Sequence, residues 1–410
     1  MPANLMVTLT FITLHGGTCF WLRVRLRLPK RHLTVALLAI ALIVIVSVLL
    51  FTKSAQVPSG GAAVCYVGVA FGGDTYEQAK AIIDKTKAYS NLFILQSGPV
   101  SVNESATRQI CDYAIAKGLN LIVAFGDLAP EILEQKNLTW RLTFVQDARA
   151  AYGEKFLGVY YYDERGGIWI DQAAGWYTPR SVDYDATAQQ FEDMFLNDGG
   201  TIALKEASIP IFCSDYTLYW FDYKSGYDVM LAEAGWNQTL AQDIALVRGA
   251  ANFQHKDWGV IVTWKYTQPP YIVDGDTVYN QMRDAYAAGA KYITVFDFPY
   301  NGTNPYGVME QEHFDALERL WNGIQNGEIE RAPQPDAVLI LPKNYGWGMR
   351  HPEDKIWGFW GADEKSPVIW DRVQLLLGRY GYSLDIAYED STYPVPVGYK
   401  VVYYWNQTDI

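Results

Sequence analysis

The stretch Phe156-Leu-Gly-Val-Tyr-Tyr-Tyr-Asp-Glu-Arg-Gly-Gly167 lies near the middle of the chain. Its aromatic and aliphatic start predicts a buried strand over residues 157–162. The strand stops at an acidic pair, Asp163-Glu164. A double glycine and an aromatic segment over residues 168–177 follow, and we interpret that segment as a loop. A strand that ends in carboxylates is informative only together with the elements around it.

Strand and helix patterns alternate on both sides of this stretch. The other strand-like runs are 63–71, 92–96, 119–125, 209–214, 227–231, 259–264 and 292–296. Helical periodicity covers 75–88, 104–117, 139–153, 184–198, 239–253, 276–289 and 311–326, and a stunted helix is expected in the short segment 216–226. Eight such units predict a (β/α)8 barrel over residues 63–327. An open doubly wound sheet is the alternative, but the first turn, Phe71-Gly-Gly-Asp-Thr75, lacks a dinucleotide-binding glycine pattern.

The N-terminal segments predict attachment to a membrane. Residues 33–52 form an uncharged apolar run of a length that spans a bilayer, and basic residues concentrate just before it. We therefore expect a cytoplasmic basic segment over 1–32, a transmembrane signal-anchor over 33–52, a linker over 53–62, and the bulk of the chain outside the cytoplasm. A cleaved signal peptide is the alternative. Whether the apolar residues 5–22 also cross the membrane stays open.

Composition excludes one class of partner. The formal net charge is −12 although residues 1–53 contain no Asp or Glu, so the rest of the chain is strongly acidic. An acidic body argues against binding to nucleic acid. The five histidines and four cysteines show no metal-binding spacing, and we expect no metal or other cofactor. Buried thiols at Cys65 and Cys111 are favoured over a disulfide. Asn-x-Ser/Thr sites, which agree with an outside location, occur at Asn103, Asn137, Asn237, Asn301 and Asn406.

A smaller unit follows the barrel after the boundary at Pro333 and Pro335. Strand patterns over 337–341, 383–388 and 399–405 and a helical pattern over 366–380 predict a small α/β module over residues 336–410. Its long aromatic loop, 342–361, contains Trp347. We expect this loop to reach over the mouth of the barrel.

Candidate chemistry lies where the barrel strands end. Alternation predicts that Tyr160, Tyr162 and Glu164 share the inward face, with Asp163 directed away to a neighbouring loop or to Arg165. Glu164 is therefore the candidate general acid/base, with a pKa raised by its aromatic surroundings. The partner carboxylate is expected from another strand: Asp297 first, then Asp215, then Glu233.

Aromatic residues crowd the same strand ends and suit carbohydrate, because sugar faces pack on rings and two carboxyl groups break the glycosidic bond. The candidate substrate-binding residues are Asp163, Tyr160, Tyr162, Trp169, Trp176, Trp264, Lys265, Tyr266, Tyr300 and Trp347. Schiff-base chemistry at Lys265 is a less favoured alternative.

The segment Gly158-Val-Tyr-Tyr-Tyr-Asp-Glu164 resembles the fourth-strand motif of glycoside hydrolase barrels, both the large retaining clan and the family 18 chitinase-like proteins. The resemblance implies that Glu164 is the acid/base. Two departures stand out. The retaining clan has a glutamate nucleophile after the seventh strand, where this chain has Thr263-Trp-Lys-Tyr266, and family 18 has aspartates where Tyr160 and Tyr162 stand. The C-terminal unit resembles the flavodoxin-like modules of some β-galactosidase barrels.

The sequence thus predicts a membrane-anchored, extracytoplasmic glycoside hydrolase-like barrel that acts on glycans. The alternative is a non-catalytic surface protein that binds a glycan or the cell envelope with the same cleft. A carboxylate within about 10 Å of Glu164 would favour the enzyme. The sugar, the linkage, the stereochemical course and the oligomeric state stay open.

Overall fold

The computed structural model describes residues 3–11, 20–28, 64–180, 182–235, 239–299, 304–332 and 334–408. It divides into two units, Met1–Ala63 and Val64–Ile410. In the first unit, β1 (Ala3–Phe11) pairs antiparallel with β2 (Phe20–Leu28), so the described parts of 5–22 are strands and not a helix. The expected anchor, 33–52, and linker, 53–62, lie outside the described residues. No helix within the described ranges is long and apolar enough to cross a membrane.

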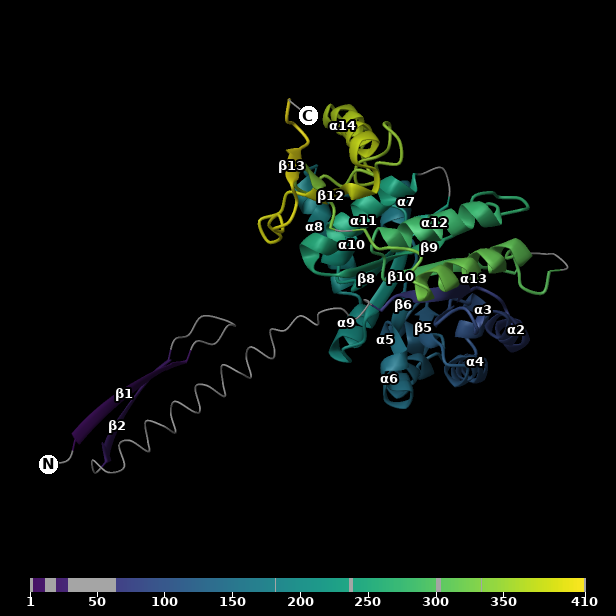
Figure 1. Cartoon of the computed structure of the whole chain (residues 1–410), viewed down its shortest axis with the longest axis horizontal. Coiled ribbons are helices and arrows are strands. Elements are labelled where there is room, and N and C mark those ends of the chain that lie inside the picture. The colour runs from purple at the N-terminus through teal and green to yellow at the C-terminus, as the bar shows by residue number, and fades with distance from the viewer. Residues whose placement is uncertain are drawn as a thin grey trace. The chain divides into compact units, whose positions relative to one another are not determined.

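The second unit contains a closed barrel of eight parallel strands, in which β10 pairs with β3 to complete the circle (Figure 1). The strands are β3 (Tyr66–Phe71), β4 (Leu92–Leu95), β5 (Asn120–Phe125), β6 (Phe156–Tyr161), β7 (Ile211–Asp215), β8 (Val229–Ala234), β9 (Asp257–Val262) and β10 (Tyr292–Asp297). Each overlaps a predicted strand. The (β/α)8 barrel is therefore confirmed, and the open sheet is excluded.

The predicted helices around the barrel are also found, with the one after β7 shortened to α10 (Tyr219–Lys224). The others with predicted counterparts are α2 (Tyr76–Thr86), α4 (Glu104–Ala116), α6 (Trp140–Tyr152), α8 (Tyr184–Leu196), α11 (Leu240–Gln254), α12 (Gly275–Ala287) and α13 (Gln311–Gln325). The sequence patterns missed α3 (Gly98–Ser101), α5 (Pro130–Gln135), α7 (Arg165–Trp176) and α9 (Gly199–Glu206).

Helix α7 corrects the interpretation of residues 168–177 as a loop. The double glycine that suggested a turn instead lets the first turn of α7 approach the segment after β7. A Cβ at Gly166 would lie 2.8 Å from the Leu218 Cβ, and one at Gly167 would lie 1.9 Å from the Tyr216 ring. Close approach of the backbone, rather than flexibility, therefore explains the two glycines.

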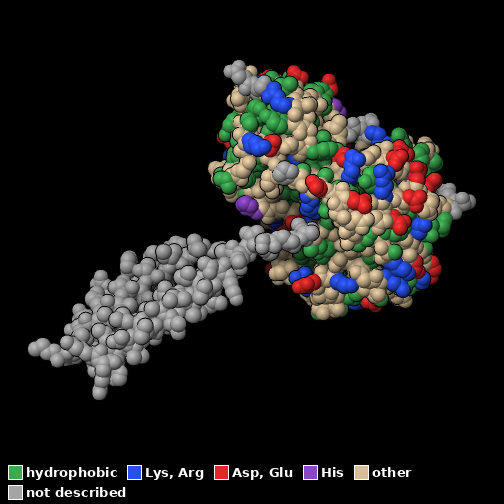
Figure 2. Space-filling view, in the orientation of Figure 1, with side chains coloured by type: hydrophobic (Ala, Val, Ile, Leu, Met, Phe, Trp, Pro, Cys, Tyr) green, Lys and Arg blue, Asp and Glu red, His purple; other side chains and the backbone are tan. Residues whose placement is uncertain are grey.

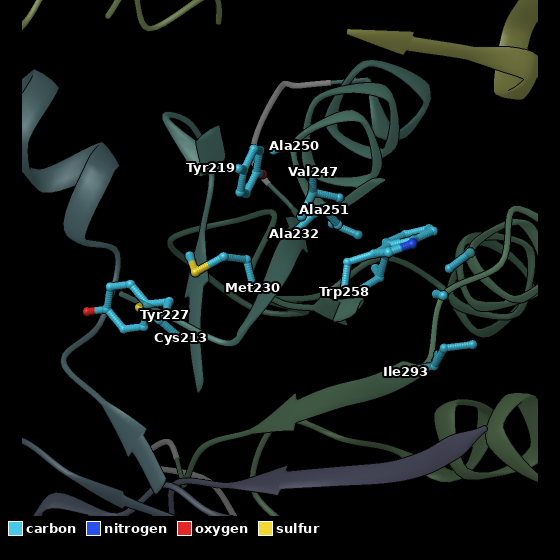
Figure 3. Packing of buried hydrophobic residues seen from close by; sticks show 14 of the residues in the cluster. Cys213, Tyr219, Tyr227, Met230, Ala232, Val247, Ala250, Ala251, Trp258 and Ile293 are labelled. Atoms are coloured by element: carbon cyan, nitrogen blue, oxygen red, sulfur yellow. The ribbon is translucent and has the colours of Figure 1, made fainter. Parts of the chain in front are cut away.

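The hydrophobic core has two layers. Side chains that fill the barrel form one cluster: Ala70, Leu92, Ile94, Ile122, Tyr160, Phe212, Val229, Leu231, Ile261 and Tyr292. A larger layer lies between the strands and the surrounding helices. Figure 3 shows part of that layer, where Ala232 of β8 lies beside Val247 and Ala251 of α11, and Met230 of the same strand extends toward Tyr227 and Cys213. Alternate residues of β8 thus serve the two layers, as the period of a strand requires.

The C-terminal segment forms a parallel sheet of β11 (Ala337–Leu341), β12 (Leu384–Tyr388) and β13 (Val401–Tyr404) in the order β12-β11-β13, with helix α14 (Lys365–Tyr380). The predicted order of elements is confirmed, but the resemblance to a flavodoxin-like module is not. The sheet packs on α11 (Figure 1). There, buried Arg248 donates to the Asp385 carboxylate at 2.7 Å and to the carbonyls of Tyr382 and Leu384.

A tight contact between α11 and β12 predicts an effect on stability. A Cβ at Gly249 would lie 2.2 Å from the Ile386 carbonyl oxygen. Gly249→Ala should therefore push β12 from α11 and lower the free energy of unfolding by about 1–3 kcal/mol, as overpacking does. Denaturant titration measures the change. The matched control is Gly378→Ala in α14, where a Cβ meets nothing within 4 Å. Equal stability of the two variants would contradict the proposed packing.

Candidate active site

The end of β6 departs from the predicted alternation. Tyr162 and Glu164 have positive φ angles of 60° and 47°, so the chain leaves the strand after Tyr161. Tyr160 stays inside the barrel, but the Tyr162 ring packs on the outward Tyr161 ring, with centroids 4.5 Å apart. The prediction that Tyr160, Tyr162 and Glu164 share one inward face was wrong, because regular alternation needs extended backbone at every step.

Two hydroxyl groups join carboxyl groups from different strands. Tyr160 donates to Asp163 Oδ1, and Ser214 Oγ donates to Glu233 Oε1 at 2.6 Å. The Tyr160 and Ser214 hydroxyls lie 2.8 Å apart. Asp163 therefore does not turn toward Arg165 or a neighbouring loop, as the sequence suggested. It is connected through β6 and β7 to Glu233 in β8.

Glu164 lies beside this network and interacts with Glu233. Burial raises the pKa of Glu164 to about 7 and repulsion from Asp163 adds to the rise, while a hydrogen-bonding interaction with the Glu233 carboxyl group opposes it. The pKa of Glu233 is raised well above its ordinary value by burial and by the charges of Glu164 and Asp163. Like charges held this close cannot all ionise at neutral pH, so the cluster retains protons.

Asp163 is the member of this cluster that reaches the barrel mouth. The residue as a whole is exposed, but its carboxyl group is enclosed, which raises its pKa. Hydrogen bonds from Tyr160 and Ser214 act in the opposite direction. Enclosure outweighs them, so Asp163 binds protons more readily than a free aspartate.

Asp215, the second predicted partner, has a different position. Its buried carboxylate accepts hydrogen bonds from the backbone amides of Gly166, Gly167, Tyr216 and Thr217. These bonds satisfy the first amides of α7, which have no partner within the helix. Asp215 therefore fixes the start of α7, and with it the backbone of Glu164, rather than facing a substrate.

Asp297, the first predicted partner, is also committed to the backbone. It is 2% exposed and accepts a hydrogen bond from the Met309 amide at 2.9 Å. No described interaction joins it to Glu164. Of the three expected partners, Glu233 is the one with a hydrogen-bonding interaction with Glu164. Alternation in β8 could have revealed this, since Val229 and Leu231 face the barrel interior and Glu233 follows them at the same period.

A cavity of about 380 Å³ opens beside Asp163 at the carboxyl ends of β4, β5, β6 and β10. Its polar lining includes Gln96, Ser97, Ser101 and Asp163. Its aromatic lining consists of Phe125, Tyr160, Tyr162, Phe296 and Phe298. A concave site with apolar walls and a few polar groups is typical of small-molecule binding.

The predicted residues after β9 border this region. The Trp264 ring meets Phe298 edge to face, with centroids 5.5 Å apart, and extends the aromatic wall. Lys265 is half-buried and Tyr266 is 45% exposed, and both backbone amides donate to the Tyr271 carbonyl. Tyr300 lies outside the described residues.

Three predicted tryptophans lie away from the cavity lining. Trp169 and Trp347 are 5% and 1% exposed, so they are core residues and not a sugar platform, which corrects the prediction. Trp169 donates from Nε1 to the Trp357 carbonyl at 3.1 Å, which joins α7 to loop 342–361. Trp176, at the end of α7, is 60% exposed. Aromatic content alone did not distinguish packing from binding.

Loop 342–361 braces α7 instead of reaching across the cavity. Arg350 forms an ion pair with Asp171 of α7 at 2.7 Å and a second pair with Asp354. Thr217, after β7, donates to the Gly348 carbonyl at 2.7 Å. No residue of this loop lines the described cavity. The loop therefore supports α7, the helix whose N-cap residue is Glu164.

Cys65, Cys111 and Cys213 are free thiols. The described residues contain no group of three His, Cys, Asp or Glu side chains that could hold a metal ion. Of the glycosylation sites, Asn103 caps α4 and Asn237 and Asn301 lie outside the described residues.

From the raised pKa of Asp297 we predict how the stability of the fold depends on pH. Burial raises its pKa to about 7, above the value of an unfolded aspartate, so the native state holds a proton that the unfolded state releases. The contribution of this proton to the free energy of unfolding is complete below about pH 4. It is lost as the pH rises through about 7, and the free energy of unfolding falls by up to ~1.4 kcal/mol per pH unit on the way. Asp297→Asn should flatten the fall in melting temperature between pH 5 and 8. A wild-type melting temperature that rises steeply over this interval, with the same rise in Asp297→Asn, would contradict it.

Comparison with known proteins supports the fold. No protein-family model and no curated protein sequence matches the chain. Among solved structures, a β-galactosidase from the Antarctic haloarchaeon Halorubrum lacusprofundi superposes with a TM-score of 0.54 and 10% identity, covering 83% of this chain and 68% of that one. A GH5_18 protein from Bifidobacterium longum subsp. longum gives 0.50 and 11%, covering 84% and 98%.

An α-L-fucosidase isoenzyme from Paenibacillus thiaminolyticus gives a TM-score of 0.50 and 12% identity, covering 83% of this chain and 60% of that chain. The barrel thus shares its fold with these three proteins. At these identities the likeness concerns the fold alone, and the family is not identified.

Proposed function

We propose that this chain is a glycoside hydrolase that acts on glycans, with Glu164 and Glu233 as its catalytic carboxyl pair. The observation that carries the proposal is the convergence of Asp163, Glu164 and Glu233 beside an aromatic cavity at the carboxyl end of the barrel. Catalytic groups of (β/α)8 enzymes occupy this end. Glycosidic bonds are generally cleaved by two carboxyl groups, one protonated and one ionised.

The charge state of the pair fits this chemistry. Because Glu164 and Glu233 repel each other as anions, the pair retains a proton near neutral pH. We assign Glu164 as the general acid/base, since a group with a pKa of about 7 both gives and takes a proton readily. Glu233 then acts as the second carboxylate. Its Oε1 accepts from Ser214, and beside Glu164 its Oε2 has no hydrogen bond of ordinary geometry among the described residues, so it is available to a reacting group.

The cavity supplies the means to hold a sugar. Phe296 and Phe298 offer faces for its C–H groups, and Gln96 and Asp163 offer hydrogen-bonding groups. The β-galactosidase and the α-L-fucosidase with the same fold are enzymes named for sugars, and this analogy supports a glycan substrate. The aromatic wall that includes Trp264 would extend the binding surface.

The test is hydrolysis of a panel of defined oligosaccharides by the purified full-length chain, followed as new reducing ends. Cleavage of at least one member supports the proposal. Binding without cleavage of any member would favour the alternative, a non-catalytic glycan- or envelope-binding barrel. The observation behind that alternative is Trp264-Lys265 at the end of β9, where the retaining clan has its glutamate.

We further propose that residues 33–52 anchor the chain in a membrane with residues 64–410 outside the cytoplasm. The motivation is the uncharged apolar run preceded by basic residues. Alkaline extraction of membranes and protease accessibility on intact cells measure attachment and orientation. Release of the chain by alkali, or protection of the barrel from external protease, would refute the anchor or its orientation.

A further inference from the structure

The carboxyl cluster has an unusual charge balance. Over the face of the molecule in Figure 2, basic side chains lie among acidic ones. In contrast, Asp163, Glu164 and Glu233 form no ion pair with a lysine or arginine among the described residues. Among the described residues that line the cavity, Asp163 is the only charged one. The carboxyl cluster therefore lies beside the cavity without a described cation from the chain to pair with it.

Two buried oxygen atoms at this place also lack partners. Glu233 is 4% exposed, and its Oε2 has no hydrogen-bond partner among the described residues. The Oε1 atom of Gln96, which lines the cavity, is likewise buried and unpartnered. Buried acceptors without donors are costly and uncommon in native structures. Gln96 Oε1 is an acceptor, and the Glu233 carboxyl group becomes one when it releases its proton, so the missing group is a hydrogen-bond donor and not another oxygen anion.

The cavity walls favour a cation of modest size. Phe125, Phe296 and Phe298 line it, and ring faces attract ammonium groups, more so where water is excluded. Its volume of about 380 Å³ is at the low end of the ~300–1,000 Å³ typical of small-molecule sites. An acidic sugar would add repulsion to the three carboxyl groups. A neutral or N-acetylated sugar would leave the cluster without a positive partner.

We propose that the cavity binds a hexosamine residue with a free amino group, whose ammonium pairs with Asp163 while the sugar face rests on the phenylalanine rings. That the ligand is a sugar rests on the proposed function, whereas its positive charge follows from the unpaired carboxyl cluster and the unpartnered Gln96 acceptor. The ammonium supplies three donors to a site that contains acceptors. The assigned substrate class is therefore a glycan that contains unacetylated amino sugar.

Binding of an ammonium has a thermodynamic consequence that a neutral sugar lacks. Asp163 is surrounded by Tyr160, Ser214, Glu164 and Glu233, which supply no positive charge. An ammonium beside it lowers the pKa of the carboxyl group. The amine must itself be protonated, so binding is accompanied by proton release from the cluster near neutral pH and weakens at high pH as the amine loses its charge.

The experiment compares glucosamine and galactosamine with their N-acetylated forms and with glucose and galactose, titrated into the full-length chain at pH 6. Calorimetry in two buffers of different ionisation enthalpy gives the affinity and the protons released. We expect at least about tenfold tighter binding of one free amine, as charge-assisted hydrogen bonds allow. Equal or tighter binding of the N-acetylated or neutral sugars would overturn the proposal.

Two variants distinguish a specific pairing of the ammonium with Asp163 from a general attraction to an acidic protein. Asp163→Asn should remove the preference for the amine and the proton release while retaining the aromatic contacts. Asp276→Asn removes an 87% exposed carboxylate away from the cavity and should leave the preference unchanged. Unchanged preference in Asp163→Asn, with the melting temperature retained, would also overturn the pairing. Amine binding without cleavage of any glycan contradicts only the proposed enzyme, whereas cleavage without amine preference contradicts only this inference.

Discussion

Replacing Glu233 by glutamine is expected to lower the turnover of a cleaved glycan by about 10²–10⁴-fold while the protein stays folded. The amide keeps the shape of the side chain and can still accept from Ser214, but it cannot exchange a proton or carry negative charge near neutral pH. Removal of a buried, repelled carboxyl group should also leave the melting temperature equal or higher. The measurements are kcat on the substrate found by the oligosaccharide panel and a thermal melt.

The comparison variants are Glu164→Gln and Asp297→Asn. Glu164→Gln should produce a loss of the same order, and the double variant should lose little more, because the two carboxyl groups act as one unit. Asp297→Asn should retain most activity, since its partner is the Met309 amide and not the carboxyl cluster. If Asp297→Asn abolishes turnover while Glu233→Gln does not, the order predicted from the sequence is right and the assignment made from the structure is wrong.

Arg248→Met is expected to lower the free energy of unfolding by about 3–5 kcal/mol, the largest effect we predict on stability. Arg248 and Asp385 are 5% and 0% exposed, so removing the guanidinium leaves a carboxylate buried without its cation. The Tyr382 and Leu384 carbonyls lose their donors as well. Denaturant unfolding, followed by tryptophan fluorescence, measures the change.

The control for this variant is Arg319→Met. Arg319 and Asp276 form an ion pair whose side chains are 60% and 87% exposed, and exposed pairs contribute only about 0–1 kcal/mol. Equal unfolding midpoints for Arg248→Met and Arg319→Met would show that the C-terminal sheet is held to α11 by packing alone.

Much of the fold could be predicted from the sequence because local patterns determine it. Runs of β-branched and aromatic residues alternate with helical periodicity, and each of the eight barrel strands lies within a few residues of its predicted place. Helix α7 was missed because Gly166 and Gly167 are usual in turns. Their actual role, to admit Tyr216 and Leu218 at close range, depends on residues far along the chain.

The candidate site was predictable only in part. That carboxylates gather at the strand ends followed from the fold, but their pairing did not. The positive φ angles of Tyr162 and Glu164 ended the alternation on which the choice of inward residues rested. Asp215 and Asp297 are committed to backbone amides, and such hydrogen bonds arise from tertiary structure that no local pattern encodes. Glu233 was the exception, since the period of β8 already pointed it inward.

Helix α7 is held from two directions, by Asp215 at its first turn and by Arg350 and Trp357 of the C-terminal segment along its length. The position of α7 therefore depends on the C-terminal segment as well as on the barrel. A protease cut or a premature stop codon after the barrel would leave all eight strands and every candidate carboxylate in place. It would nevertheless remove the contacts of α7, whose N-cap residue is Glu164, with Arg350 and Trp357. A related protein that had the barrel but lacked the C-terminal segment would keep the Asp163-Glu164 motif, but the helix that positions Glu164 would lose half of its support.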